Sequence, residues 1–67
     1  MEFAIDDDKL TNVVEIVNDE IDPRATKALI KDHICSDWPN AVEHQEWLDT
    51  ATPHEIVDWV ASTAYGN

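Results

Sequence analysis

The chain has 67 residues, 43% of them hydrophobic, and its 15 acidic side chains against four basic ones give a formal net charge of −11 at pH 7. This length predicts one domain, residues 1–67, and so small a domain buries only about 60% of the surface that its unfolded chain exposes. Because binding to nucleic acids and anionic lipids depends largely on Lys and Arg, the charge argues against direct binding of nucleic acid or membrane.

The first predicted helix spans 9–20. One apolar stripe repeats at the helical spacing, and its members are Leu10, Val13, Val14, Val17 and Ile21. Asp7 or Asp8 is expected to cap this helix, since a carboxylate suits both the free amides and the dipole of a helix N-terminus.

The second predicted helix spans 23–34. Asp22 followed by Pro23 is the pattern of an N-cap with proline at the first helical position. On this helix Arg24, Lys27 and Lys31 would form a basic stripe, paired with nearby acids such as Glu20 or Asp32.

Two further helices are predicted, at 41–50 and 53–64. Asn40 with Glu43 three residues later fits a variant of the capping box. The sequence signals the start of the helix at 53–64 more strongly. Thr52 is the expected N-cap, Pro53 stands at the first helical position and Glu55 at the third, and Gly66 lies just beyond the C-terminal end of the helix. The chain is therefore expected to be all-α, a small bundle of about four short helices.

Charge is distributed unevenly along the chain. From Asp32 to the C-terminus there are seven carboxylates and no Lys or Arg, and this half also holds all three Trp and all three His. Helical wheels place Trp47 and Trp59 at the margins of their apolar faces, and Trp38 falls in a loop. Trp is enriched at the centres of protein interfaces. The predicted partner-binding residues are Trp47, Trp59, Glu43, Glu46, Asp49, Glu55 and Asp58.

No motif indicates a reaction or a cofactor. The histidines His33, His44 and His54 and the single Cys35 lack the close ligand pairs of zinc sites, so no metal is expected, and the two His nearest apolar faces, His33 and His44, are expected to be structural. A glycine-rich phosphate loop is impossible with one Gly, and no nucleophile stands beside a recognisable base. The chain is not expected to be an enzyme. It also starts without a signal-peptide pattern, so a cytoplasmic location is expected.

The sequence favours a small acidic protein-interaction module that binds a basic protein surface. Its narrower versions are an inhibitor or a nucleic-acid mimic of the kind that viruses and mobile elements encode. The alternative is a structural or assembly subunit, a helical homo-oligomer in which the acidity serves solubility or high-salt adaptation and the basic stripe of one copy meets the acidic half of another. A domain that senses pH or metal through its histidines is a third hypothesis.

Overall fold

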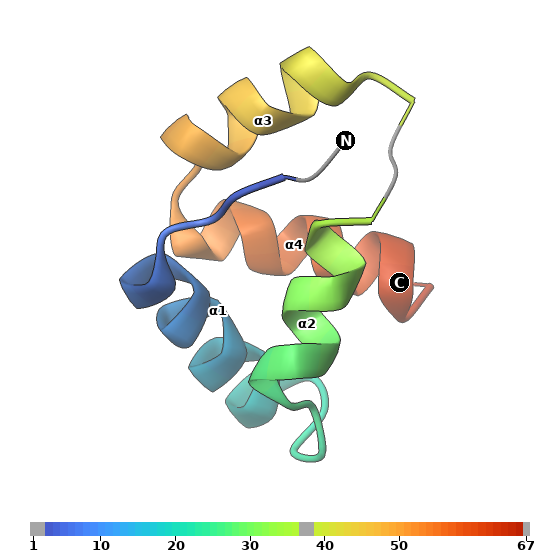
Figure 1. Ribbon diagram of the computed structural model, residues 1–67. Helices are drawn as coiled ribbons and strands as arrows, with labels where there is room; N and C mark the ends of the chain where they lie inside the picture. The colour runs from blue at the N-terminus through green and yellow to red at the C-terminus, as the bar shows by residue number, and fades with distance from the viewer. Residues whose placement is uncertain (1–2, 37–38, 67) are drawn as a thin grey trace.

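Helices make up most of the computed structural model, which describes residues 3–36 and 39–66. They are α1 (Asp7–Glu20), α2 (Lys27–Ile34), α3 (Ala41–Thr50) and α4 (Pro53–Ala64). Figure 1 shows α1, α2 and α4 packed against one another, with α3 lying across them and the N-terminal segment running between α3 and the other helices. The prediction of a small all-α fold with four helices is confirmed.

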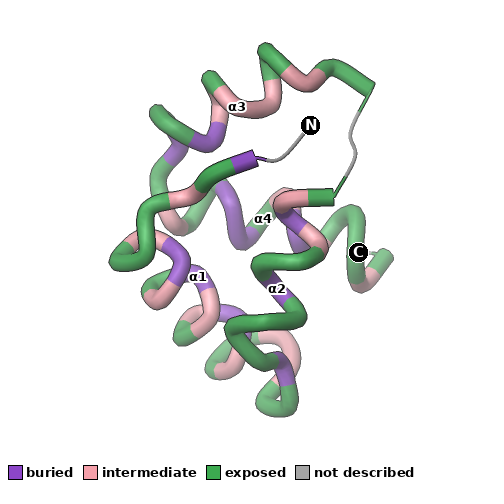
Figure 2. The backbone as a smooth tube through the Cα atoms, viewed as in Figure 1, coloured by how far each residue is buried: buried purple, intermediate pink, exposed green. Residues whose placement is uncertain are grey.

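A single apolar core holds the three packed helices together. Val13 and Val17 of α1, Ile34 of α2 and Ile56 and Val60 of α4 have no exposed surface. The buried positions of each helix recur on one side, as the tube in Figure 2 shows by its alternating colours. Each helix thus contributes one apolar stripe to a shared interior, which is the arrangement that helical periodicity predicts.

The first helix begins two residues earlier than the sequence indicates. Asp6, rather than Asp7 or Asp8, is the N-cap, and its carboxylate accepts a hydrogen bond from the Lys9 amide at 3.3 Å. Asp7 and Asp8 occupy the first turn instead, where their charge still suits the dipole. The predicted stripe is confirmed, with Leu10, Val13 and Val17 buried.

The predicted start of the second helix at residue 23 is wrong, because α2 begins at Lys27. The Asp22 carboxylate accepts from the Arg24 amide at 3.0 Å, and the Asp22 carbonyl accepts from the Ala25 amide at 3.1 Å, so residues 22–25 form a turn. The Asn18 amide group donates to the carbonyls of Asp22 and Ala25 at 3.0 and 2.8 Å.

Thr26 is the true cap of α2. Its backbone is extended, and its hydroxyl accepts from the Leu29 amide at 3.1 Å, the bond that the Ala25 carbonyl would accept in a longer helix. The predicted basic stripe is therefore also wrong as a feature of one helix, since Arg24 lies in the preceding turn. Lys27 forms an ion pair with Asp7 of α1, not with Glu20 or Asp32, and this pairing lowers the pKa of the Asp7 carboxyl.

The helices α3 and α4 have the predicted bounds, 41–50 and 53–64, but different kinds of start. Thr52 and Glu55 form a complete capping box, with Thr52 Oγ1 accepting from the Glu55 amide at 3.2 Å and the Glu55 carboxylate accepting from the Thr52 amide at 3.0 Å. These bonds lower the pKa of the Glu55 carboxyl. The predicted capping box at Asn40 is wrong, because the Asn40 side chain makes no capping hydrogen bond.

Replacing Thr52 by Ala should lower the free energy of unfolding by about 1 kcal/mol, because it removes the acceptor for the Glu55 amide and leaves half of the box. Urea unfolding followed by circular dichroism measures the change. Asn40→Ala is the matched control, a helix cap without a side-chain bond, and its effect should be much smaller. Equal losses in the two variants would contradict the assignment of the caps.

Candidate functional site

The helix α3 is attached to the rest of the protein by side chains. The Gln45 side-chain amide pairs with the backbone of Ala4 in both directions, accepting from its N–H and donating to its carbonyl, each at 2.9 Å. At the other end of the helix the Lys9 ammonium donates to the carbonyls of Leu48 and Asp49 at 3.0 and 3.4 Å. These last-turn carbonyls have no partner within the helix and carry its negative dipole end, so a cation suits them.

His44 is the central side chain under α3. Its Nε2 lies 2.9 Å from the Ile34 carbonyl, and since a carbonyl only accepts, Nε2 carries the proton and donates. The imidazole and the Phe3 ring form a T-shaped pair at 4.8 Å between centroids; the imidazole also stacks on Trp47 at 5.8 Å and contacts Trp59 at 5.3 Å. One ring therefore joins the N-terminal segment, α2, α3 and α4.

The two predicted anchor residues lie side by side. The Trp47 and Trp59 rings are 5.5 Å apart between centroids, with their planes inclined at 57°. Both are half-buried, which confirms their placement at the margins of the apolar faces. Trp38 lies outside the described residues.

A groove of about 290 Å³ opens beside this pair. Its lining residues are Pro39, Asn40, Glu43, His44, Trp47 and Trp59. The groove thus joins the first turn of α3 to the middle of α4. It brings together three of the predicted site residues, Glu43 and the two indoles, around one concave surface.

The other four predicted carboxylates are exposed but do not line the groove. Asp49 accepts a hydrogen bond from the Gln45 amide at 3.0 Å, and Glu55 belongs to the capping box of α4. Glu46 lies one turn after Glu43 on the outer side of α3, and Asp58 follows Glu55 by one turn on α4. The predicted surface therefore divides into an aromatic groove with one carboxylate, Glu43, and exposed carboxylates outside the groove on α3 and on α4.

His33 borders the same aromatic group from α2. Its ring lies 5.2 Å from that of Trp59 between centroids, and its Nε2 lies 2.7 Å from Thr63 Oγ1. The Thr63 hydroxyl donates its proton to the Trp59 carbonyl at 2.8 Å, so His33 Nε2 must be the donor to Thr63. Burial lowers the pKa of His33, against a smaller opposing effect of Asp32. His33 and His44 are both half-buried, which agrees with their expected place near apolar faces, and His54 is exposed.

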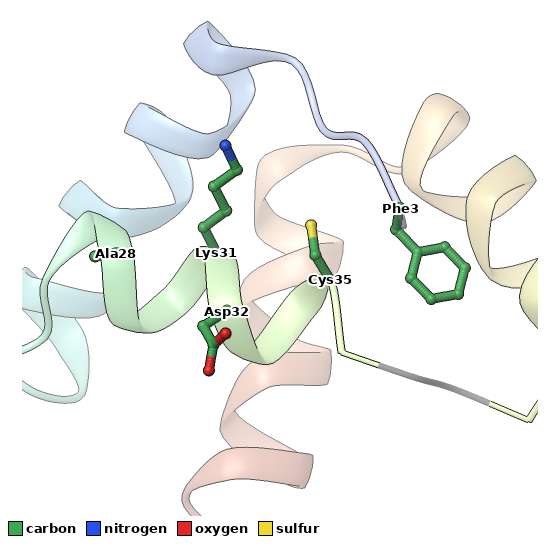
Figure 3. Close-up of a pocket in the computed structure, with 5 residues that line it drawn as sticks. All are labelled: Phe3, Ala28, Lys31, Asp32 and Cys35. Carbon is green, nitrogen blue, oxygen red and sulfur yellow. The ribbon is translucent and has the colours of Figure 1, made fainter. Parts of the chain in front are cut away.

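Cys35 lines a different cavity, of about 450 Å³, together with Phe3, Ala28, Lys31 and Asp32. Figure 3 shows Lys31 and Cys35 projecting from the same side of α2, while Asp32 points away from them. Cys35 is half-buried. Its described neighbours in this cavity include no imidazole that could act as a base for a nucleophilic thiol.

A third cavity, of about 400 Å³, lies between α2 and the end of α4. Its walls are formed by apolar residues, Leu29, Ile30, Ala64 and Tyr65, and by polar ones, Asp22, Asp32, His33 and Ser36. Leu29 is 56% exposed. The Tyr65 hydroxyl donates to the Asp22 carboxylate at 3.0 Å and fastens the end of α4 to the turn before α2; burial raises the pKa of this phenol.

Sequence reasoning missed the residues that position the groove. Gln45 and Phe3 gave no signal, because their contacts join residues about 40 positions apart, for example 41 positions between Ala4 and Gln45. No group of three or more His, Cys, Asp or Glu that could hold a metal ion is found within residues 3–36 and 39–66. None of the described helices is long and apolar enough to cross a bilayer.

Comparisons with known proteins add no further assignment: no family model, curated protein or solved structure matches the chain.

Replacing Gln45 by Ala should loosen α3 and lower the free energy of unfolding by about 1 kcal/mol, because two exposed hydrogen bonds to Ala4 are lost. Urea unfolding gives the change, and hydrogen exchange of the α3 amides locates it. Glu46→Ala is the control at the next, exposed position of the same helix. If both variants keep wild-type exchange rates in α3, the proposed attachment through Gln45 is wrong.

Protonation of His33 should lower the free energy of unfolding as the pH drops below about 6.5, the pKa of this imidazole in the unfolded chain. The folded state holds this imidazole with a lowered pKa, so between the two pKa values the unfolded state binds more protons, and stability rises with pH there. Unfolding free energies at pH 8 and pH 5 should therefore differ more in the wild type than in His33→Gln. The comparison cancels the contributions that the carboxylates make in both proteins. The same pH dependence in the two would contradict the role given to His33.

Proposed function

We propose that this chain is a small acidic protein-interaction module that binds a basic protein surface through α3 and α4. The observation that carries the proposal is the pair of half-buried indoles, Trp47 and Trp59, 5.5 Å apart beside the carboxylate of Glu43. Aromatic anchors surrounded by polar residues are the usual centre of a protein interface. With a net charge of −11, complementarity requires a cationic partner.

The basic side chains of the protein do not neutralise this surface in the described structure. Lys9 is directed to the last carbonyls of α3, and Lys27 pairs with Asp7 of α1. Glu43, Glu46 and Asp58 remain exposed, so their field is available to steer a cationic protein toward the indoles. A partner whose basic surface normally binds nucleic acid would make the module an inhibitor or a mimic of nucleic acid. A cytoplasmic location belongs to this proposal.

Three carboxylates near the groove should contribute more to partner binding than three elsewhere. The site variant combines Glu43→Gln, Glu46→Gln and Asp58→Asn, and the control combines Glu15→Gln, Asp19→Asn and Glu20→Gln on α1. Both remove three negative charges from exposed positions. Binding to a basic peptide of alternating Lys and Arg is measured by calorimetry between 50 and 300 mM salt.

The site variant should bind about 3- to 100-fold more weakly, from three ion pairs of surface strength, and its affinity should depend less on salt. The control variant should stay near wild type. Equal losses in the two variants would show attraction by net charge alone, and absence of binding at low salt would remove the proposed function.

An assembly subunit is the second candidate, and Leu29 is the observation in its favour. This side chain is 56% exposed beside the apolar residues that line part of the cavity between α2 and α4. A homo-oligomer that covered it would show a mass above one chain in light scattering, increasing with concentration. Leu29→Gln would then restore the mass of one chain, whereas Val42→Gln, at a 66% exposed position of α3, would not.

A further inference from the structure

We infer that the groove beside Trp47 and Trp59 receives the side chain of one arginine from the basic partner. The inference rests on the proposed function and gives its site a specific occupant. Three properties of the groove support it: its size, the aromatic faces that form its walls, and the position of its one carboxylate.

The size of the groove suits a single side chain. Its volume of about 290 Å³ lies just below the range of about 300 to 1,000 Å³ that is typical of sites for small molecules and cofactors. The lining residues extend from Pro39, before α3, to Trp47 in the second half of α3 and include Trp59 of α4, so the groove lies at the surface between two helices. A side chain that projects from a partner can enter such a groove while the partner backbone stays outside.

Aromatic walls select a cation or an apolar group. The planes of Trp47 and Trp59 are inclined at 57°, so the two rings do not cover each other face to face. Indole has the strongest cation–π attraction of the aromatic side chains, and it acts within about 6 Å of the ring centroid. Both indoles line the groove, so a guanidinium inside it lies within reach of an indole ring.

The carboxylate decides between an apolar and a cationic occupant. Glu43 lies one helical turn before Trp47 and lines the same groove. An apolar side chain would remove water from this carboxylate without giving it a partner, which costs free energy. A guanidinium can instead donate two parallel hydrogen bonds to it while its plane stacks on an indole.

Arginine is favoured over lysine and over a second copy of this chain. A guanidinium is planar and weakly hydrated, whereas a lysine ammonium is compact and strongly hydrated, so stacking on an indole costs arginine less. A second copy could offer only Arg24, the single arginine of the chain, and each copy carries a net charge of −11. The mutual repulsion of two such copies opposes that contact and favours a basic partner.

The test uses two peptide probes of nine residues, nine lysines in one and a central arginine among eight lysines in the other. Their charges are equal, so a general attraction to the acidic chain is the same for both. Calorimetry gives the affinities, and NMR follows the two indole N–H signals, which Trp47→Phe and Trp59→Phe assign. The arginine probe should bind about 2- to 30-fold more tightly and shift both signals.

The control pair for the carboxylate is Glu43→Gln and Asp58→Asn, which remove the same charge from exposed positions, inside and outside the groove. Glu43→Gln should reduce the preference for the arginine probe, whereas Asp58→Asn should keep it. Circular dichroism confirms that each variant folds, and these two substitutions leave the aromatic side chains intact.

Each other outcome overturns the inference in a distinguishable way. Equal affinities for the two probes with unmoved indole signals would contradict arginine binding in the groove, but the proposed function as an interaction module would remain. If neither probe bound at low salt, both the inference about arginine and the proposed function would be wrong. Concentration-dependent indole shifts without any probe, abolished by Arg24→Ala, would identify a second copy of the chain as the occupant.

Discussion

The arrangement of this protein depends on how α3 is held. A helix of ten residues is not stable alone in water, so α3 needs contacts with the rest of the chain. The imidazole of His44 supplies the central contact, since its Nε2 donates to the last carbonyl of α2 while its ring meets Phe3, Trp47 and Trp59. Gln45 and Lys9 fix the helix on either side. Side-chain hydrogen bonds and ring contacts thus supplement the burial of Leu48.

The same attachment determines where the charges lie. Lys9 is drawn to the end of α3, and Lys27 to the start of α1, so two of the four basic side chains serve the fold. Glu43 and Glu46 consequently stay on the outer side of α3 without a cationic partner in the described residues. The acidic surface is therefore a consequence of composition, with 15 acids against four bases, and of position, because two of the four bases are engaged elsewhere.

Local patterns predicted the helices, and long-range hydrogen bonds explain the errors. The bounds of α3 and α4 were predicted to the residue, since Thr52 and Pro53 separate them by chemistry that is local in sequence. The start of α2 was missed because Asn18, on the preceding helix, holds the Ala25 carbonyl. For the site, periodicity placed Trp47 and Trp59 at the margins of their helices. Their mutual contact and the groove beside them could not be predicted, because they depend on how α3 crosses α4.

The position of the indoles bears on why the chain is acidic. Acidity that serves only solubility or salt adaptation is effective anywhere on the surface and needs no aromatic neighbour. Half-exposed indoles work against solubility unless something covers them. Here both rings contact His44, which holds each indole in a fixed orientation in the protein alone. A preorganised anchor loses little side-chain entropy on binding, and this physical advantage supports the proposed recognition surface over a purely solvating role.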